Sequence, residues 1–170
     1  MIFMKKIFLL IVSLCMFSSV CMASPVYFYN YSNTSNYAYE PNTDKNYAQS
    51  VAALVNRERL KAGVRPLILN PYLCSRSDIR ANELATIFAH TRPDGSQFYT
   101  VLDRRKFHYM TAGENAAAGA SSPQEVVNIW MNSPGHRQNI LNPKFRYIGV
   151  GYAYVPNSQY NNYWIQIFSD

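Results

Sequence analysis

Two histidines and one glutamate in the C-terminal part of the chain are the residues whose types and spacing could do chemistry together. They are His90 in the segment His-Thr-Arg-Pro-Asp-Gly, Glu114 in Gly-Glu-Asn, and His136 in Ser-Pro-Gly-His-Arg. Two imidazoles and a carboxylate can bind a divalent metal ion or exchange protons. Because 24 and 22 residues separate them along the chain, only the fold can bring them together.

These three residues fit two kinds of site. With both imidazoles neutral, they form the ligand set of zinc sites that keep one coordination position open. Alternatively, they form a polar cluster in which Glu114 orients one ring through a hydrogen bond. His136 is expected at the third position of a short helix capped by Ser133, where the helix dipole disfavours the imidazolium form. No nucleophile stands out, since Cys74 has the pattern of a small buried residue.

Three helices are expected to position these residues. Apolar residues at helical spacing predict a first helix that ends just before Gly63. A second helix begins at the start signal Asn70-Pro71 and should end near Ala89. Its predicted buried side consists of Leu73, Ala81, Leu84 and Phe88. The segment 122–125, Ser-Pro-Gln-Glu, is a capping box that starts the third helix.

The end of the chain has the alternation and turn residues of paired strands. Residues 147–155 and 163–168 are predicted strands, and the turn-forming residues between them favour an antiparallel hairpin. A further strand around 114–118 would complete a small sheet, with residues 64–69 as an extended connector and a short helix around 98–102. Helices on the faces of such a sheet make an α+β layered domain.

The N-terminal 23 residues have the pattern of a secretory signal peptide. Lys5 and Lys6 precede an apolar run, and small residues precede a cleavage point after Ala23. The run is too short for a membrane span, so we expect export, with no transmembrane span in the mature chain. Residues 24–46 are rich in Tyr, Asn and Ser and predict a flexible linker. Residues 47–170 are then one folded domain.

Charge and cysteine content narrow the class of protein. The formal net charge of +6 falls to +4 once Lys5 and Lys6 leave with the signal peptide. That excess of positive charge is too small and too dispersed to indicate nucleic-acid binding. It is compatible with a protein that acts next to anionic polymers, and equally with charge that only keeps the protein soluble. Of the three cysteines, Cys74 alone lies beyond the signal peptide, so the exported chain can form no internal disulfide.

Six segments of the domain occur in a distinctive order. They are residues 51–60, 67–70, 90–95, 113–115, 130 with 133–141, and 148–151. In wording and spacing they resemble the CAP superfamily, the SCP-like domains of cysteine-rich secretory proteins, venom allergens and plant pathogenesis-related proteins, and most of all its disulfide-free bacterial branch. The resemblance implies a three-layer α-β-α sandwich with a small antiparallel sheet. It also implies a cleft in which His90 and His136 match the histidines that bind zinc in some members and Glu114 matches the first glutamate.

The chain departs from the family pattern at one position. The family's second glutamate follows the helix tryptophan, here Trp130, by about three residues, and that position is Ser133. Glu125 precedes the tryptophan on another part of the helix and does not replace it. The site is therefore expected to be a triad with Zn²⁺ as its candidate metal and Glu114 as a ligand or a supporting group. A mechanism that needs two carboxylates is disfavoured.

Three functions stay open at this point. The first is a secreted binding module whose cleft recognises an extracellular or envelope ligand, whether polymer, lipid or protein, without chemistry. The second is a metal-assisted hydrolase of peptide or glycan bonds, and the third is a structural protein tethered by its linker. The missing acid and nucleophile favour the first. We expect a monomer that acts outside the cell or at its envelope.

Overall fold

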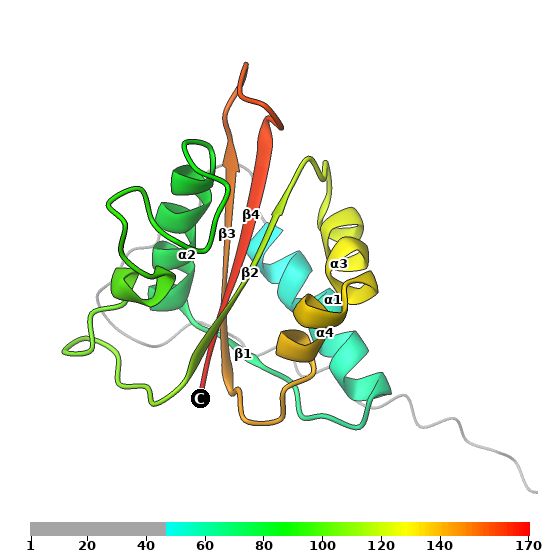
Figure 1. Cartoon of the computed structure of the whole chain (residues 1–170). Coiled ribbons are helices and arrows are strands. Elements are labelled where there is room, and N and C mark those ends of the chain that lie inside the picture. The colour runs from blue at the N-terminus through cyan, green and yellow to red at the C-terminus, as the bar shows by residue number, and fades with distance from the viewer. Residues whose placement is uncertain (1–46) are drawn as a thin grey trace, which may run out of the picture. The chain divides into compact units, whose positions relative to one another are not determined.

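The computed structural model describes residues 47–170, which form three layers (Figure 1). One helix, α2, covers one face of a four-stranded sheet, and α1, α3 and α4 cover the other. The predicted α-β-α sandwich is confirmed. The elements are α1 (Tyr47–Lys61), β1 (Ile68–Leu69), α2 (Pro71–Leu84), the 3-10 helix η1 (Phe98–Val101), β2 (Ala112–Ala118), α3 (Pro123–Asn132), α4 (Pro134–Ile140), β3 (Tyr147–Tyr154) and β4 (Asn162–Ser169).

The sheet has the strand order β1-β3-β4-β2, which places β2 at one edge. Strands β3 and β4 form the predicted antiparallel hairpin, with Tyr147 opposite Ser169. Strand β2 pairs antiparallel with β4, so the strand expected around 114–118 is confirmed and begins two residues earlier. The predicted connector 64–69 ends in β1, which adds one short parallel pair to β3.

Two apolar cores lie on the two faces of the sheet. In β4, Trp164 and Phe168 face α1 and α3, whereas Ile165 and Ile167 face α2. All four side chains are 0% exposed, as expected for a central strand covered on both faces, whose successive side chains point to opposite sides. The sheet is therefore a rigid platform from which the edge strand β2 presents its residues.

Two glycines of β3 let α2 lie directly on the sheet. A Cβ atom added at Gly149 would lie 2.2 Å from the backbone carbon of Leu73, and one at Gly151 would lie 2.2 Å from that of Ser77. Both positions exclude any side chain, because the obstructing atoms are backbone. The close contact fixes α2, and with it the residues that α2 directs towards β2.

The predicted helix starts and the first helix stop are confirmed. The Asn70 side chain accepts a hydrogen bond from Leu73 N at 3.1 Å, and Pro71 follows the cap. Helix α1 ends in a Schellman motif, in which Val64 N donates to Arg59 O and Gly63 has a φ of 70°. These local signals were sufficient because each is satisfied within a few residues.

The capping box of α3 is also present, with one change in the partner of its glutamate. Glu125 N donates to Ser122 Oγ at 3.2 Å, as predicted. The Glu125 carboxylate accepts from Ser121 N and Ser121 Oγ, one residue before the cap. Glu125 is therefore occupied at the helix start and does not supply a second acid to the site.

The predicted end of α2 was wrong. The helix ends at Leu84 rather than near Ala89, and Phe88, predicted on its buried side, is 51% exposed. The last turn tightens before the chain leaves the helix, because Ala85 N and Thr86 N donate to the carbonyl oxygens three residues back, Asn82 O and Glu83 O. The Arg80 side chain then binds the carbonyl oxygen of Ala89 at 2.9 Å, which bends this segment towards the site.

The predicted signal peptide and linker lie outside the described residues. Their boundaries at residues 23 and 46, and the domain start at 47, stay predictions. Within residues 47–170, no helix is long and apolar enough to cross a membrane.

Candidate functional site

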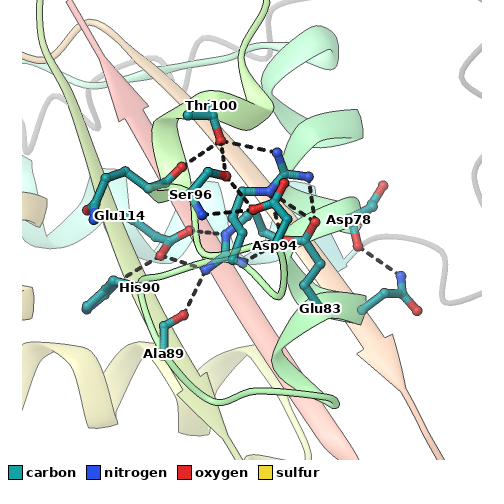
Figure 2. Close-up of polar contacts among 12 residues, drawn as sticks. Asp78, Glu83, Ala89, His90, Asp94, Ser96, Thr100 and Glu114 are labelled. Atoms are coloured by element: carbon teal, nitrogen blue, oxygen red, sulfur yellow. Dashed lines mark hydrogen bonds and ion pairs between the residues drawn. The ribbon is translucent and has the colours of Figure 1, made fainter.

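Glu114 lies on β2, and its carboxylate is fully engaged. Oε2 accepts from Arg80 Nε at 2.9 Å, and Oε1 accepts from Arg80 Nη2 at 3.2 Å. Oε1 also lies 2.8 Å from His90 Nδ1 (Figure 2). The Glu114 side chain is 1% exposed. A buried carboxylate needs such compensation, because an unpaired charge in this position would be very costly.

Arg80 is the site residue that sequence reasoning missed. It projects from α2 towards Glu114, and its side chain is 0% exposed. Its position among Leu73, Ala81 and Leu84 on the buried face was the available signal. An arginine is almost never fully buried without a partner, so this position predicts a buried acid that the sequence could not identify.

A second ion pair fixes the segment that carries His90. Glu83 accepts from Arg80 Nη1 at 2.6 Å and from Arg92 Nη2 at 2.6 Å. Arg92 also donates to Thr100 Oγ1 at 3.2 Å (Figure 2). Ion pairs and hydrogen bonds thus hold the loop between α2 and η1 on both sides of His90. Polar contacts, rather than apolar packing, position this histidine.

His90 is the exposed member of the site, with a side chain 58% exposed. Because an ionised carboxylate only accepts hydrogen bonds, His90 Nδ1 is the donor to Glu114. This assigns the Nδ1–H tautomer to the neutral ring and leaves Nε2 for solvent or a ligand. The hydrogen bond to Glu114 raises the pKa of His90 above its ordinary value of 6.5, against an opposing contribution from partial burial.

His136 is the third residue of α4 and lies close enough to His90 to sense its charge. Burial, and then the charge of His90, lower the pKa of His136 below 6.5. The neutral ring was predicted from the helix dipole, but Ser133 makes no side-chain capping bond. The direction agrees with the prediction, whereas the main cause is burial.

Two asparagines connect α4 to the edge strand. Glu114 and Asn115 are adjacent in β2, so they point to opposite faces of the sheet. Asn115 Nδ2 donates to the carbonyl oxygen of His136 at 3.0 Å. Asn139 Nδ2 donates to the carbonyl oxygen of Glu114 at 3.2 Å and to Asn115 Oδ1 at 2.9 Å. These contacts hold α4, and with it His136, against β2. Glu114 and His90 lie on the opposite face of the same strand.

The geometry limits what a metal ion could use here. Glu114 is committed to Arg80 and His90, so it suits the role of orienting His90 rather than that of a ligand. Within residues 47–170, no group of three or more His, Cys, Asp or Glu side chains is arranged to hold a metal ion. His136 Nδ1 is buried without a hydrogen-bond partner in this part of the chain. Two imidazoles are thus the available donors, one fewer than the three protein ligands of a catalytic zinc site.

The other candidate groups have structural roles. Cys74 is 3% exposed, and burial raises the pKa of its thiol to about 12, so it is a packed residue and not a nucleophile. Trp130 and Trp164 are 0% exposed core residues. His108, in the basic segment after η1, is exposed.

The α-β-α sandwich of this chain is the fold of the CAP, or SCP-like, class of domain. The sequence profile of the cysteine-rich secretory protein family, CAP, matches residues 52–168, and the chain belongs to this family. It is similar to the uncharacterized protein YkwD of Bacillus subtilis, with 39% identity over 115 residues. That alignment covers 66% of this chain and 45% of YkwD, so the chain spans less than half of that relative.

Solved structures with the same fold come from three other bacteria. An extracellular protein with an SCP domain from Bacillus anthracis is 27% identical with a TM-score of 0.63, covering 72% of this chain and 40% of that one. A cysteine-rich secretory protein from Staphylococcus aureus is 23% identical with a TM-score of 0.60, covering 81% and 43%. An outer surface protein from Borrelia burgdorferi is 20% identical with a TM-score of 0.65, covering 76% and 96%. The last two likenesses establish the fold alone.

Proposed function

We propose that this CAP-domain protein is exported and that the site at His90, Glu114 and His136 binds an extracellular or envelope ligand without chemistry. The observation that carries the proposal is the engagement of both Glu114 oxygens by Arg80 and His90. A general base or a nucleophile needs a lone pair that can reach the substrate. The Glu114 side chain, 1% exposed and doubly paired, is poorly suited to either role.

The group offered to a ligand is the outer edge of His90. Glu114 holds the ring through Nδ1, and this hydrogen bond raises the pKa of His90, which favours the protonated form in which Nε2–H is a donor. A preoriented donor of this kind favours ligands that present an anionic or carbonyl oxygen. Envelope polymers, lipid headgroups and protein segments all carry such groups, and the site alone does not choose among them.

Action outside the cytoplasm is supported by two observations. The first 23 residues have the signal-peptide pattern described above. The Bacillus anthracis relative is described as extracellular. We therefore place the ligand outside the cell or in its envelope.

A metal-assisted hydrolase of peptide or glycan bonds is the second candidate. It is favoured by the buried His136 Nδ1, which has no hydrogen-bond partner among residues 47–170 and would be satisfied by a bound ion. The engagement of Glu114 counts against it, because two imidazoles are too few for the usual catalytic zinc site.

Binding and turnover can be measured on the same samples. Cell envelopes of the producing organism, intact and after removal of lipid and protein, are incubated with wild type, His90→Ala and the control His108→Ala, with added Zn²⁺ or with chelator. We expect wild type and His108→Ala to cosediment with envelopes, His90→Ala to stay in solution, and no amino groups or reducing ends to be released. Product release that is abolished by chelator and by Glu114→Gln would instead establish the hydrolase. Cosedimentation of His90→Ala equal to that of wild type would refute binding at this site.

A further inference from the structure

A row of three aromatic rings with an arginine at each end lies on the α2 side of the domain, formed by residues distant in sequence. Arg76 lies over the Tyr72 ring at 5.3 Å, and Tyr72 stacks on Phe107 at 5.7 Å. Phe107 meets Tyr147 edge to face at 5.8 Å, and Arg146 lies over the Tyr147 ring at 5.7 Å. We call these five residues the cation–aromatic row.

The two arginines of the row have no acidic partner among residues 47–170. Arg105 and Lys61, in contrast, are paired with Asp103 and Glu58. A guanidinium contacts an aromatic ring through its own flat face, whereas its N–H groups lie in its plane. Those N–H groups therefore stay available at the edge of the contact. Arg76 makes one weak side-chain bond, from Nε to Ser75 Oγ at 3.3 Å. Most donors of both groups are therefore available to an anion.

The backbone beneath the row is fixed. Arg146 N donates to Ser169 O at 2.8 Å, and its carbonyl oxygen accepts from Ile68 N at 2.8 Å. The hydroxyl oxygen of Tyr72 accepts from Asp103 N at 2.6 Å, which ties the loop before Phe107 to α2. The backbone positions of the two arginines are thus set by the sheet and α2, so both charges are carried by fixed elements.

We propose that the cation–aromatic row binds a linear polymer of sugar or polyol units joined by phosphodiesters. Each guanidinium takes a phosphate through paired N–H donors, and the half-buried rings between them pack against the C–H groups of the polyol units that lie between those two phosphates. The row is separate from the His90 site, and the proposal does not depend on the function proposed for that site. It adds a second binding surface directed at the envelope.

A polymer fits the row better than a bilayer does. Tyr72, Phe107 and Tyr147 lie half-buried against one another instead of projecting, whereas membrane surfaces take up projecting apolar side chains beside the cations.

The test measures binding of the purified protein to immobilised poly(glycerol phosphate) over a series of salt concentrations. The row variant Arg76→Gln/Arg146→Gln is compared with the control Arg57→Gln/Arg105→Gln, which removes the same charge from two exposed arginines outside the row. Circular dichroism and a thermal melt establish that both variants are folded. We expect the row variant to bind at least tenfold more weakly and with a shallower salt dependence, and the control to match wild type.

Four results would overturn the proposal. Equal weakening of both double variants would show that net charge and not the row is responsible. Equal or tighter binding to anionic phospholipid vesicles would assign the surface to a bilayer. Equal binding to single-stranded DNA would show that the polyol unit is not recognised. Failure of wild type to bind poly(glycerol phosphate) at low salt would show that the row does not bind this polymer.

Discussion

Replacing Arg80 with methionine should be among the most destabilising single changes in the domain. Arg80 makes four hydrogen bonds, two to Glu114, one to Glu83 and one to the carbonyl oxygen of Ala89. Methionine fills similar volume, but it leaves the Glu114 carboxylate buried with His90 as its remaining charged contact. Removing one partner of a buried ion pair typically costs about 3–5 kcal/mol, a large part of the stability of a domain.

Removing both charges should cost less than the sum of the single changes. Glu114→Leu alone leaves Arg80 paired with Glu83, and we expect a loss of about 2 kcal/mol. The double variant Arg80→Met/Glu114→Leu leaves no unpaired charge buried at this position. Its loss of stability should therefore be about 1–3 kcal/mol smaller than the sum of the two single losses. The exposed pair of Arg105 and Asp103 supplies the control, since Arg105→Met should leave stability within error.

Urea unfolding followed by circular dichroism measures these differences. With a slope of about 2 kcal/mol per M, Arg80→Met should lower the midpoint by about 1.5–2.5 M. A loss no larger than that of Arg105→Met would refute the reasoning. A double variant that loses the full sum of the single losses would show that Arg80 and Glu114 are not coupled.

Three further predictions concern packing, metal and export. Gly151→Ala should cost about 3 kcal/mol or more in a thermal melt, because the added Cβ would lie 2.2 Å from the backbone of Ser77; an unchanged melting temperature would contradict the close packing of α2. Calorimetric titration with Zn²⁺ should give weak binding that either His90→Ala or His136→Ala abolishes, and undiminished binding in both would place the ion elsewhere. N-terminal sequencing of the secreted protein should show cleavage after Ala23, and an intact N-terminus in the membrane would refute it.

Features of the fold that depend on near neighbours could be predicted from the sequence. The Asn70 cap, the capping box that ends at Glu125 and the Gly63 stop are each completed by residues a few positions away. The end of α2 could not be predicted in this way. Phe88 continues the apolar spacing of the helix, yet it lies 51% exposed beyond the helix end. The bond from Thr86 N to Glu83 O tightens the last turn, and Arg80 then holds the carbonyl oxygen of Ala89.

His90, Glu114 and His136 were singled out from sequence motifs as candidate site residues, and their role stays a prediction. The structure joins two of them directly, since His90 Nδ1 lies 2.8 Å from Glu114 Oε1. The partner of Glu114 is Arg80, 34 residues away, and no local pattern connects the two. That pairing decides the chemistry, since it leaves Glu114 to orient His90 rather than to act on a substrate.

The two histidines have opposite dependences on pH, because a hydrogen bond to Glu114 raises the pKa of His90 and burial lowers the pKa of His136. The raised pKa of His90 means that its bond to Glu114 stabilises the fold fully below pH 6.5 and that this contribution is lost as the pH rises through the raised value. The lowered pKa of His136 means that its contribution is present above pH 6.5 and is lost as the pH falls through the lowered value.

Histidine titration by NMR tests the central claim most directly, which is that Glu114 holds and charges His90 for binding. Ring signals of wild type and Glu114→Gln are followed across pH, with assignment by single His→Gln variants. In wild type, His90 should titrate above 6.5 and His136 below it, and in Glu114→Gln the pKa of His90 should fall. A His90 pKa that is the same in wild type and Glu114→Gln would contradict the account.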